Sequence, residues 1–501
     1  MDYEKAFDKV WHTGLWIKLA RCGVGGDFLK VIMNMYKDIT SCVTVNGNIS
    51  DPFHISQGVR QGENLSPFLF ALYINDLEEF LLAEGCSPVD MGIAFDDRVS
   101  DYLKILITIY ADDTVIFAES ETQLQKALDK LDIYCRKWKL SVNCSKTKIM
   151  TFGGKKNAYQ YPFKFQGKLL ENVSSFKYLG LTFNFNGKFN LGVKHLKEQG
   201  RRAMMALLRR SRQLELPVST QLDLFNTLVR PVLTYSCEVW GYSCVEIVEA
   251  LHLEYCKYVL HLKKSTPDCF VYGETGQFPL YIHIYSRMVK FWHKLVTGNS
   301  GKYSAAILHT LLECLTFNIY SSDWLLKIQQ ILNECGLSFV WNFPHSVSTK
   351  WLDATLTQKL KDIFLQKWAE KCNVCRKGCH YSLFKSQFGF ECYLDDLPQC
   401  YRIALTKLRT SNHKLPVEKG RYANLPRDQR FCTLCNTDQM GDEYHFLLEC
   451  PSLADLRTRF IPRYYSAHPN FFKYSELLTL NKKKETLNLS KFAFHGMKFF
   501  K

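Results

Sequence analysis

Hydrophobic residues in the first 185 positions follow two spacings, one typical of strands and one typical of helices. Runs of β-branched and aromatic residues at 105–110 and 114–118 are separated only by Ala111, Asp112 and Asp113. Such a short gap between two strand-like runs predicts a β-hairpin. We therefore expect two paired strands whose turn carries adjacent carboxylates.

Helices are predicted on both sides of this hairpin. Ser120 and Gln123 form a capping-box pair before an apolar stripe that has the spacing of one helix face: Leu124, Leu128, Leu131, Cys135 and Trp138. Ser66 as N-cap and Pro67 at the first helical position predict an earlier helix. We expect the helix over 121–138 to pack on the sheet.

The chain changes character near residues 184–188, where Asn and Gly cluster, and most of the chain beyond this point has helical spacing. Residues 194–212 predict a basic amphipathic helix with Ala203, Met204, Leu207 and Leu208 buried. Its cations are Lys194, Lys197, Arg201, Arg202, Arg209, Arg210 and Arg212, offset only by Glu198. We expect contact with phosphates; a solvated face without a ligand is the alternative.

Composition indicates a folded chain of several domains. The 501 residues are 47% hydrophobic and 23% charged, which is ordinary for globular proteins and speaks against disorder, collagen-like repeats and coiled coils. No apolar run approaches the roughly 18 residues of a membrane span, so no membrane partner is expected. Nineteen cysteines without a secretory leader favour a reducing compartment, and a net charge of +15 favours a polyanionic partner over a merely basic surface.

The adjacent aspartates of the predicted turn repel one another unless cations or protons neutralise them. Divalent metal ions satisfy that need, and a two-metal site holds ions about 3.5–4 Å apart, one activating a hydroxyl and one stabilising a leaving group. Asp112 and Asp113 supply part of such a cage. Asp2 is the candidate for a third carboxylate, from another strand.

Several ordered motifs resemble those of reverse transcriptases. The residues YADD at 110–113 resemble the Tyr-x-Asp-Asp box, residues 1–10 resemble the first aspartate motif, and GVRQGENLSP at 58–67 resembles the motif that comes after it. Residues 140–148 are similar to the lysine-bearing motif and 176–180 to the primer-grip hairpin. The residues at 5–10, 229–235 and 238–241 resemble those of the reverse transcriptases of LINE-type, non-LTR retrotransposons of the apurinic-endonuclease class.

This resemblance implies an α+β fold. It comprises a right-hand polymerase palm, an antiparallel sheet with packed helices, followed by a mostly helical thumb and C-terminal region. The expected divisions are a palm over 1–185 without fingers, a thumb-like region over 186–265, a helical region of unassigned role over 266–420, a zinc knuckle over 421–465 and a tail over 466–501.

The resemblance also implies an RNA-directed DNA polymerase that uses two magnesium ions, an RNA template, a DNA primer or target and deoxynucleoside triphosphates. Asp2, Asp112 and Asp113 would hold the magnesium, with the Tyr3 carbonyl as a further ligand. The residues expected near the nucleotide or template are Phe7 as steric gate, Arg60, Gln61, Gly62, Tyr110 and Lys146. The family implies an intracellular protein, found in a cytoplasmic ribonucleoprotein and in the nucleus.

Two departures from the family pattern affect this expectation. Asn64 stands where most relatives carry Pro, and only one residue precedes Asp2. We therefore expect a truncated element without fingers or endonuclease, whose Asp2 lies on an end that frays. A catalytically inactive remnant that only binds nucleic acid is the alternative; a maturase or telomerase relative fits the palm but not the C-terminal segment.

Near the C terminus, Cys432 and Cys435 are followed by His445 and Cys450. Three thiolates and one imidazole make a complete tetrahedral zinc set, and four separate buried residues are the alternative. Flanking residues that include Leu415, Glu418 and Arg430 resemble the zinc-binding segment of such retrotransposon proteins, which is thought to bind nucleic acid. The more cramped group of Cys372, Cys375, Cys379 and His380 leaves a second zinc site open.

Overall fold

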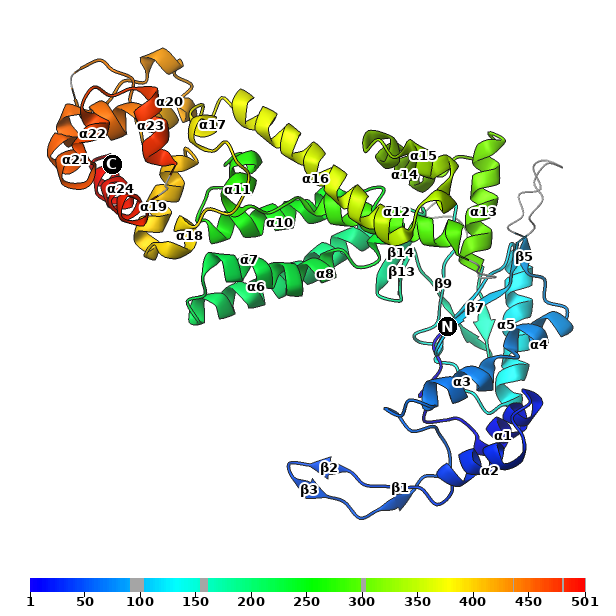
Figure 1. Cartoon of the computed structure of the whole chain (residues 1–501). Helices are drawn as coiled ribbons and strands as arrows, with labels where there is room; N and C mark the ends of the chain where they lie inside the picture. The colour runs from blue at the N-terminus through cyan, green and yellow to red at the C-terminus, as the bar shows by residue number, and fades with distance from the viewer. Residues whose placement is uncertain (91–102, 154–160, 299–302, 436, 480–481, 501) are drawn as a thin grey trace. The chain divides into compact units, whose positions relative to one another are not determined.

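The computed structural model describes residues 1–90, 103–153, 161–298, 303–435, 437–479 and 482–500. The chain divides into two compact units (Figure 1). Unit 1 comprises Met1–Tyr178, Phe183–Lys188 and Ser300–Ser321; unit 2 comprises Leu179–Thr182, Phe189–Asn299 and Ser322–Lys501.

Unit 1 mixes helices with short strands, as the sequence predicts. Its helices are α1 (His12–Arg21), α2 (Gly26–Met35), α3 (Ser66–Ile74), α4 (Leu77–Ala83), α5 (Glu121–Lys137) and α13 (Tyr303–Thr316). Its strands are β1 (Thr40–Ser41), β2 (Thr44–Val45), β3 (Asn48–Ile49), β4 (Phe53–His54), β5 (Val89–Asp90), β6 (Lys104–Ile105), β7 (Ile107–Tyr110), β8 (Asp113–Ile116), β9 (Lys148–Ile149), β10 (Lys164–Phe165), β11 (Lys168–Leu169), β12 (Glu171–Asn172) and β13 (Ser175–Tyr178). The chain passes to unit 2 in the hairpin between β13 and β14 (Leu181–Asn184).

The strands pair two by two rather than in one broad sheet. Among the described residues, β7 pairs with β8 in antiparallel register, and β9 pairs with β12 in parallel register. The predicted hairpin is therefore confirmed, with one shift: Asp113 is the first residue of β8 and not part of the turn. The backbone of Tyr110 lies opposite Asp113 in the register.

The predicted helix after the hairpin is confirmed as α5. The Gln123 N–H donates to the Ser120 hydroxyl at 3.3 Å, which satisfies one of the unpaired amides at the helix start. The prediction for Ser66 is wrong in detail: Leu65 is the N-cap of α3, and the Ser66 hydroxyl donates to the Arg60 carbonyl at 2.5 Å. Ser66 thus ties the helix to the preceding loop.

A buried lysine joins three helices in the core of unit 1. Lys18 of α1 is 2% exposed, and its ammonium donates to Asp76 Oδ1 and to the Tyr134 hydroxyl, both at 2.6 Å. It also lies 3.9 Å from the ring centroid of Trp138. Burial lowers the pKa of Lys18 to about 8, although Asp76 favours the charged form. The cation is thus enclosed by rings and acceptors that fix α1 against α5.

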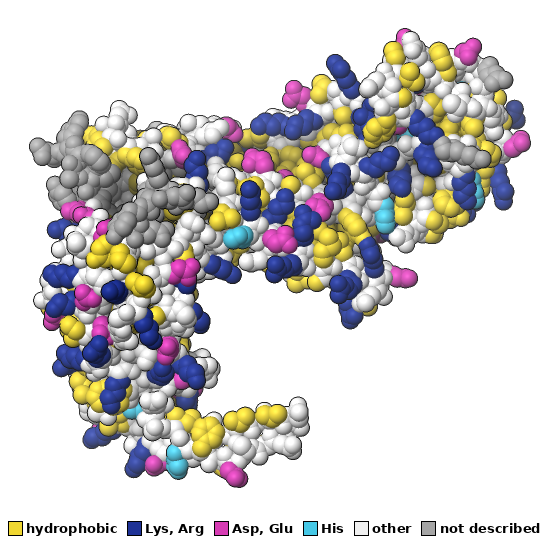
Figure 2. Space-filling view, turned by 180° about the vertical axis from the view of Figure 1, so that it is seen from behind, with side chains coloured by type: hydrophobic (Ala, Val, Ile, Leu, Met, Phe, Trp, Pro, Cys, Tyr) yellow, Lys and Arg dark blue, Asp and Glu magenta, His cyan; other side chains and the backbone are white. Residues whose placement is uncertain are grey.

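A β-ribbon built from β1 to β4 extends from unit 1 and carries apolar side chains with few charges (Figure 2). Val43, Val45 and Ile49 are 53%, 60% and 70% exposed. The register Thr44 with Ile49 and Val45 with Asn48 closes the ribbon at its tip.

Unit 2 is mainly helical. Its helices of seven or more residues are α6 (Asn190–Gln213), α7 (Val218–Leu224), α10 (Val245–Val259), α11 (Asp268–Thr275), α12 (Leu280–Thr297), α14 (Asp323–Glu334), α16 (Thr349–Val374), α19 (Gln399–Arg409), α20 (Pro416–Tyr422), α21 (Ala454–Phe460), α23 (Phe471–Leu478) and α24 (Lys483–Gly496). Shorter helices are α8 (Arg230–Leu233), α9 (Cys237–Trp240), α15 (Ser338–Asn342), α17 (Tyr381–Phe384), α18 (Tyr393–Asp396) and α22 (Arg463–Ser466).

Long helices of unit 2 pack in pairs, α12 along α16 and α6 along α10 (Figure 1). Ser286 of α12 donates to Asp353 of α16 at 2.6 Å, and Arg201 of α6 pairs with Glu254 of α10 at 2.7 Å. Deeper in the unit, the buried Arg409 pairs with the buried Glu274 at 3.0 Å. Among the described residues, no helix has the length and hydrophobicity needed to cross a membrane.

Candidate catalytic site and zinc cluster

The β7–β8 turn presents the predicted aspartates at the edge of unit 1. Ala111 and Asp112 form the two-residue loop, and Ala111 adopts a left-handed φ of 53°. That conformation costs a residue with a Cβ about 1–2 kcal/mol. Asp112 and Asp113 are both partly exposed, and Tyr110 is 65% exposed. The turn is therefore strained and open to solvent.

Asp2 lies on a segment held between two others. Met1 exchanges backbone hydrogen bonds with Thr114 of β8, since its ammonium donates to the Thr114 carbonyl at 2.6 Å. On the other side, Asn143 N–H donates to the Asp2 carbonyl at 2.8 Å and Glu4 N–H to the Ser141 carbonyl at 2.8 Å. The predicted fraying of this end is not seen, because backbone bonds hold both sides of residues 1–4.

The three carboxylates form one electrostatic site. Partial burial raises the pKa of Asp113, and the neighbouring charges of Asp112 and Asp2 raise it further, while the Met1 ammonium lowers it. Burial lowers the pKa of that ammonium, which the charges of Asp113 and Asp2 oppose. The carboxylates therefore repel one another, and cations bound between them would reduce that repulsion.

Residues 140–148, the predicted lysine-bearing motif, hold Asp2 from the side. The Asp2 N–H donates to the Thr147 hydroxyl at 3.3 Å, and Lys146 Nζ lies 3.6 Å from Asp2 Oδ2. Asn143 Oδ1 accepts from the amides of Ser145 and Lys146 at 3.1 and 3.3 Å, which shapes the turn. The positioning roles of Asn143 and Thr147 were not predicted, although both residues lie in the recognised motif.

The segment after Asp2 packs on the glycine-bearing motif. The Val59 N–H donates to the Phe7 carbonyl at 2.7 Å, and the Phe7 ring stacks on Phe70 at 5.0 Å between centroids. Gly58 has a φ of 97°, and a Cβ there would lie 2.7 Å from the Asp8 carbonyl oxygen. Only glycine fits this approach, which places the loop beside Phe7.

Two of the residues expected near the nucleotide, Arg60 and Gln61, have partners within the protein. Gln61 Nε2 donates to Asp8 Oδ1 at 2.9 Å. Arg60 pairs with Glu63 at 2.6 Å and donates to the Met35 carbonyl at 2.7 Å. Gly62 also has a positive φ, 93°, but a Cβ there would meet nothing within 4 Å. The structure thus brings Gln61 to the Asp2–Asp8 segment, whereas Arg60 points to α2.

The predicted primer-grip hairpin is present, and Tyr235 braces its turn. The turn between β13 and β14 consists of Leu179 and Gly180, both with positive φ. The Tyr235 hydroxyl donates to the Leu179 carbonyl at 2.8 Å, and Tyr235 also lies against Gly180. Tyr235 belongs to the motif at 229–235, so two separately recognised motifs meet at this turn.

The C-terminal Cys and His residues converge. Within the part of the chain that the structure describes, Cys432, Cys435, His445 and Cys450 are the one group of three or more such residues whose ligand atoms all lie within 4.8 Å of one another. The Cys432 and Cys450 sulfurs are 3.9 Å apart, and Cys435 Sγ is 3.3 Å from His445 Nε2. A tetrahedral zinc ion with ordinary bond lengths needs about 3.8 and 3.5 Å. The donors therefore fit zinc.

Residues around this cluster hold the donors in place. The Arg457 guanidinium donates to the carbonyls of Leu447 and Cys450 at 2.8 and 2.9 Å. The Asp442 carboxylate accepts from the His445 N–H at 3.0 Å, and Glu449 Oε2 lies 3.6 Å from His445 Nδ1. Burial lowers the pKa of His445, which favours the neutral imidazole that metals bind.

Comparisons with known proteins find similarity over a region that includes most of unit 1. Residues 1–183 match the family model described as reverse transcriptase (RNA-dependent DNA polymerase). Residues 1–183 form a reverse transcriptase domain. The chain is similar to "RNA-directed DNA polymerase from mobile element jockey" of Drosophila melanogaster, with 26% identity over 249 residues, 48% of this chain and 25% of that protein.

Two further similar proteins carry names of mobile elements. A "Probable RNA-directed DNA polymerase from transposon X-element" is 24% identical over 252 residues, 49% of this chain and 26% of the relative. A "Retrovirus-related Pol polyprotein from type-2 retrotransposable element R2DM" is 28% identical over 198 residues, 38% of this chain and 18% of the relative. Both are from Drosophila melanogaster. The chain spans about a quarter of the length of the jockey relative.

After the reverse transcriptase domain, the predicted basic helix is confirmed as α6. Met204, Leu207 and Leu208 are buried, whereas Ala203 is half-buried. Lys194, Arg202, Arg209, Arg210 and Arg212 are exposed, and Arg201 is engaged with Glu254. Lys and Arg outnumber Asp and Glu on the face drawn in Figure 2. The exposed cations of α6 are available to phosphates.

The second cysteine group does not gather into one site in the described residues. The thiols of Cys372 and Cys375 lie in hydrogen-bond contact with Cys269 instead. Cys379 Sγ accepts from Arg427 Nη2 at 2.8 Å, and this guanidinium and His380 lower the pKa of the thiol against the effect of burial. The structure therefore gives no support to a second zinc ion.

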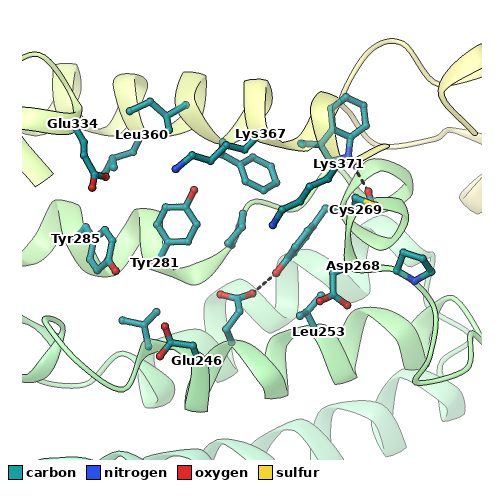
Figure 3. Close-up of a pocket in the computed structure, with 18 of the residues that line it drawn as sticks. Glu246, Leu253, Asp268, Cys269, Tyr281, Tyr285, Glu334, Leu360, Lys367 and Lys371 are labelled. Carbon is teal, nitrogen blue, oxygen red and sulfur yellow. Dashed lines mark hydrogen bonds between the residues drawn. The ribbon is translucent and has the colours of Figure 1, made fainter. Parts of the chain in front are cut away.

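A cavity of about 670 Å³ lies in unit 2 between α10, α12 and α16 (Figure 3). Lys367 and Lys371 project towards it from α16, Tyr281 lies on α12, and Glu246 and Glu334 contribute carboxylates. None of the predicted catalytic or nucleotide-binding residues and none of the four converging Cys and His residues lines it, although Cys375 of the second cysteine group does. Its mixed charges do not match a polyanion.

Proposed function

We propose that the chain is the RNA-directed DNA polymerase of a non-LTR retrotransposon and extends a nicked target strand on an RNA template. The observation that carries this proposal is that the segment bearing Asp2 pairs with β8, so that the charges of Asp112 and Asp2 both act on the partly exposed Asp113. Neighbouring carboxylates disfavour ionisation unless cations are added.

In this proposal the three aspartates would hold two magnesium ions, which would supply positive charge to activate the primer hydroxyl and to stabilise the leaving pyrophosphate. The primer 3′-oxygen attacks the α-phosphorus of the nucleotide, and the bond to the β-phosphate oxygen breaks. The Tyr3 carbonyl supports a further metal bond, since no hydrogen bond to it is found among the described residues. Lys146, 3.6 Å from Asp2 in this state, would turn to the phosphates.

Phe7 and Gln61 suit the nucleotide side of the site. Phe7, five residues after Asp2, is held against Phe70, so its ring has the fixed position that a steric gate against a ribose 2′-hydroxyl requires. Gln61 is tied to Asp8 on the same segment. Arg60 requires release from Glu63 before it reaches a phosphate, so we assign it a weaker role than Gln61.

For the regions outside the site we propose a palm over 1–185, a thumb-like region over 186–265 and a zinc knuckle over 421–465. The exposed cations of α6 and the bracing of the Leu179–Gly180 turn by Tyr235 support a thumb that contacts template and primer. The fit of Cys432, Cys435, His445 and Cys450 to tetrahedral geometry supports a structural zinc ion.

Primer extension on an RNA template with magnesium and deoxynucleotides tests the activity. Asp112→Asn removes one charge at nearly the same volume and should lower the extension rate about a thousandfold, because metal charge stabilisation is worth several kcal/mol. Asp129→Asn is the matched control, since Asp129 is exposed on α5 in the same unit, away from the turn. Equal rates for wild type and Asp112→Asn would contradict the proposal.

A second candidate is a chain that binds nucleic acid without catalysis. The five exposed cations on α6 favour it, because they do not depend on the carboxylate site. No extension by the wild-type chain, together with RNA binding that weakens steeply with salt, would favour this candidate over the polymerase.

A further inference from the structure

Three cysteines of unit 2 gather where the first turn of α11 meets the end of α16. Cys269 is the second residue of α11, Cys372 lies in the last turn of α16, and Cys375 directly follows that helix. The thiols of Cys372 and Cys375 both contact the Cys269 thiol. We call these three residues the Cys269 group.

Packing between the two helices fixes this arrangement. The Trp368 indole N–H donates to the Cys269 carbonyl at 2.8 Å. Cys372 lies four residues after Trp368, so both side chains project from the face of α16 that packs on α11. A Cβ on Gly273, one turn further along α11, would lie 3.1 Å from the Trp368 ring, so the helices approach closely. The contact between Cys269 and Cys372 therefore joins two packed helices and does not depend on a loop.

The group combines a thiol beside a cavity with a thiol that is fully enclosed. Cys269 and Cys375 line the cavity between α10, α12 and α16, and Figure 3 shows Cys269 beside it. Cys269 is 9% exposed, whereas Cys372 is 2% exposed and does not line the cavity. A small oxidant that enters the cavity therefore meets Cys269 before Cys372.

The contact also favours different protonation states for the two sulfurs. The hydrogen bond from the Cys372 thiol lowers the pKa of Cys269 against the effect of burial, and the amides of Cys269 and Phe270 at the start of α11 lower it further. The contact with Cys269, together with burial, raises the pKa of Cys372. The thiolate is the nucleophilic form of cysteine, and a helix N-terminus stabilises it. Cys269 is therefore suited to attack, and Cys372 is suited to keep its proton.

We propose that the Cys269 group is a site of reversible oxidation, at which a hydroperoxide converts Cys269 and Cys372 into a disulfide between α11 and α16. The Cys269 sulfur attacks a peroxide oxygen and the O–O bond breaks, so Cys269 becomes a sulfenic acid and the hydroperoxide is reduced to an alcohol or water. The Cys372 sulfur then attacks the Cys269 sulfur, the S–O bond breaks, and the released hydroxide leaves as water with the Cys372 proton. This modification goes beyond the proposed polymerase activity and uses none of its residues.

Peptide mapping of the full, zinc-loaded chain tests the proposal. The reduced chain is treated with hydrogen peroxide, its remaining thiols are alkylated, and it is digested without reductant for mass spectrometry. The expected product is a peptide pair joined through Cys269 and Cys372, lighter by two hydrogen atoms than the free peptides and separated by a dithiol reductant. Cys269→Ala should abolish this pair. Cys335→Ala is the matched control and should leave the pair unchanged, because Cys335 is also buried in unit 2 but lies on neither α11 nor α16.

Removal of the other two thiols separates the two steps. The double variant Cys372→Ala/Cys375→Ala should accumulate a sulfenic acid on Cys269 that a diketone reagent traps, because both thiols that contact Cys269 are absent. Cys375→Ala alone should leave the Cys269–Cys372 pair unchanged. Loss of the pair in this variant, or a wild-type pair between Cys269 and Cys375 in its place, would overturn the assignment of Cys372.

Other outcomes would overturn the site itself. One is a wild-type chain without the pair at a peroxide dose that oxidises Cys400, an exposed free thiol. Another is an equal yield of the pair after unfolding in urea, because the packing of α11 on α16 would then not direct the reaction. Asp112→Asn should form the same pair as wild type, so failure of the polymerase proposal would be seen in primer extension alone.

Discussion

The carboxylate site of unit 1 and the Cys–His cluster of unit 2 both contain side chains that can bind metal ions, but they are built in opposite ways. Asp2, Asp112 and Asp113 are partly exposed on a strained turn and a paired backbone segment. Cys432, His445 and Cys450 are buried and closed in by Arg457 and Asp442. Open metal sites suit catalysis and closed sites suit structure, so accessibility distinguishes the two before any ion is added.

The supports of the two sites differ as well. Around the aspartates, backbone pairing with Thr114 and Asn143 fixes the positions of like charges without neutralising them. Around the thiols, the donors already stand at distances close to those of a zinc tetrahedron. The comparison predicts that the fold of unit 1 holds its site without metal, whereas the zinc cluster needs its ion.

The largest effect is expected from a change to the thiol cluster. Cys450→Ser should abolish zinc binding at the cluster and unfold residues around 430–453, because structural zinc contributes roughly 10–16 kcal/mol of apparent binding free energy. Metal analysis and hydrogen exchange of that segment measure both effects. Cys400→Ser is the control, since Cys400 is an exposed free thiol. Full zinc content and unchanged hydrogen exchange in Cys450→Ser would contradict the prediction that the cluster needs its ion.

A smaller effect is expected from the loop that supports the carboxylate site. Gly58→Ala places a Cβ 2.7 Å from the Asp8 carbonyl, whereas Gly62→Ala meets nothing within 4 Å, and both glycines have similar positive φ. The strain of a positive φ costs each variant about 1–2 kcal/mol, and the collision adds about 1–3 kcal/mol to Gly58→Ala alone. Chemical unfolding without metal measures the difference. Equal losses would show that the Gly58 contact does not hold the site.

Local patterns allowed much of this site to be predicted, and contacts between distant residues account for the rest. Strand-like runs on both sides of Asp112 predicted the hairpin, and the Ser120–Gln123 pair predicted the start of α5, because both depend on neighbours in the chain. The pairing of residues 1–4 with Thr114 and Asn143 joins residues more than 100 positions apart. Terminal position alone therefore suggested a frayed end that the fold does not have.

The spacing of the cysteines predicted only in part which of the two groups forms a cluster that can bind a metal ion. A two-residue gap followed by His and Cys predicted the donors that converge, but the spacing of Cys372, Cys375 and Cys379 could not reveal that Cys269, about a hundred residues earlier, contacts two of them. Exposed and buried aromatic residues look alike in a helical pattern, so the sequence did not show which of them lie at the surface. Exposure, which only the fold determines, separates Phe472 from the buried Tyr474.

The smallest expected effect is a gain in stability when the carboxylate site loses a ligand, whereas loss of a ligand at the thiol cluster lowers stability. This difference in sign is the most direct test of the comparison. Asp113→Asn removes one of three mutually repelling charges, so without magnesium the variant should be more stable than wild type by about 0.2–1 kcal/mol at low salt. Burial and the neighbouring carboxylates hold the pKa of Asp113 above its ordinary value, so the folded chain binds the proton more tightly than the unfolded chain. Wild type should therefore lose stability relative to the variant as pH rises from about 4 through that raised pKa.

Thermal unfolding across pH, with and without magnesium, measures this difference, and Asp129→Asn is the control for loss of a surface charge. Added magnesium should stabilise wild type more than the variant, because an ion that binds only the folded chain adds stability in proportion to its affinity. A ligand of the closed cluster behaves otherwise, since losing Cys450 can only destabilise. If Asp113→Asn instead lowered stability without magnesium, the carboxylates would be a structural support like the thiols, and solvent exposure would no longer distinguish the two sites.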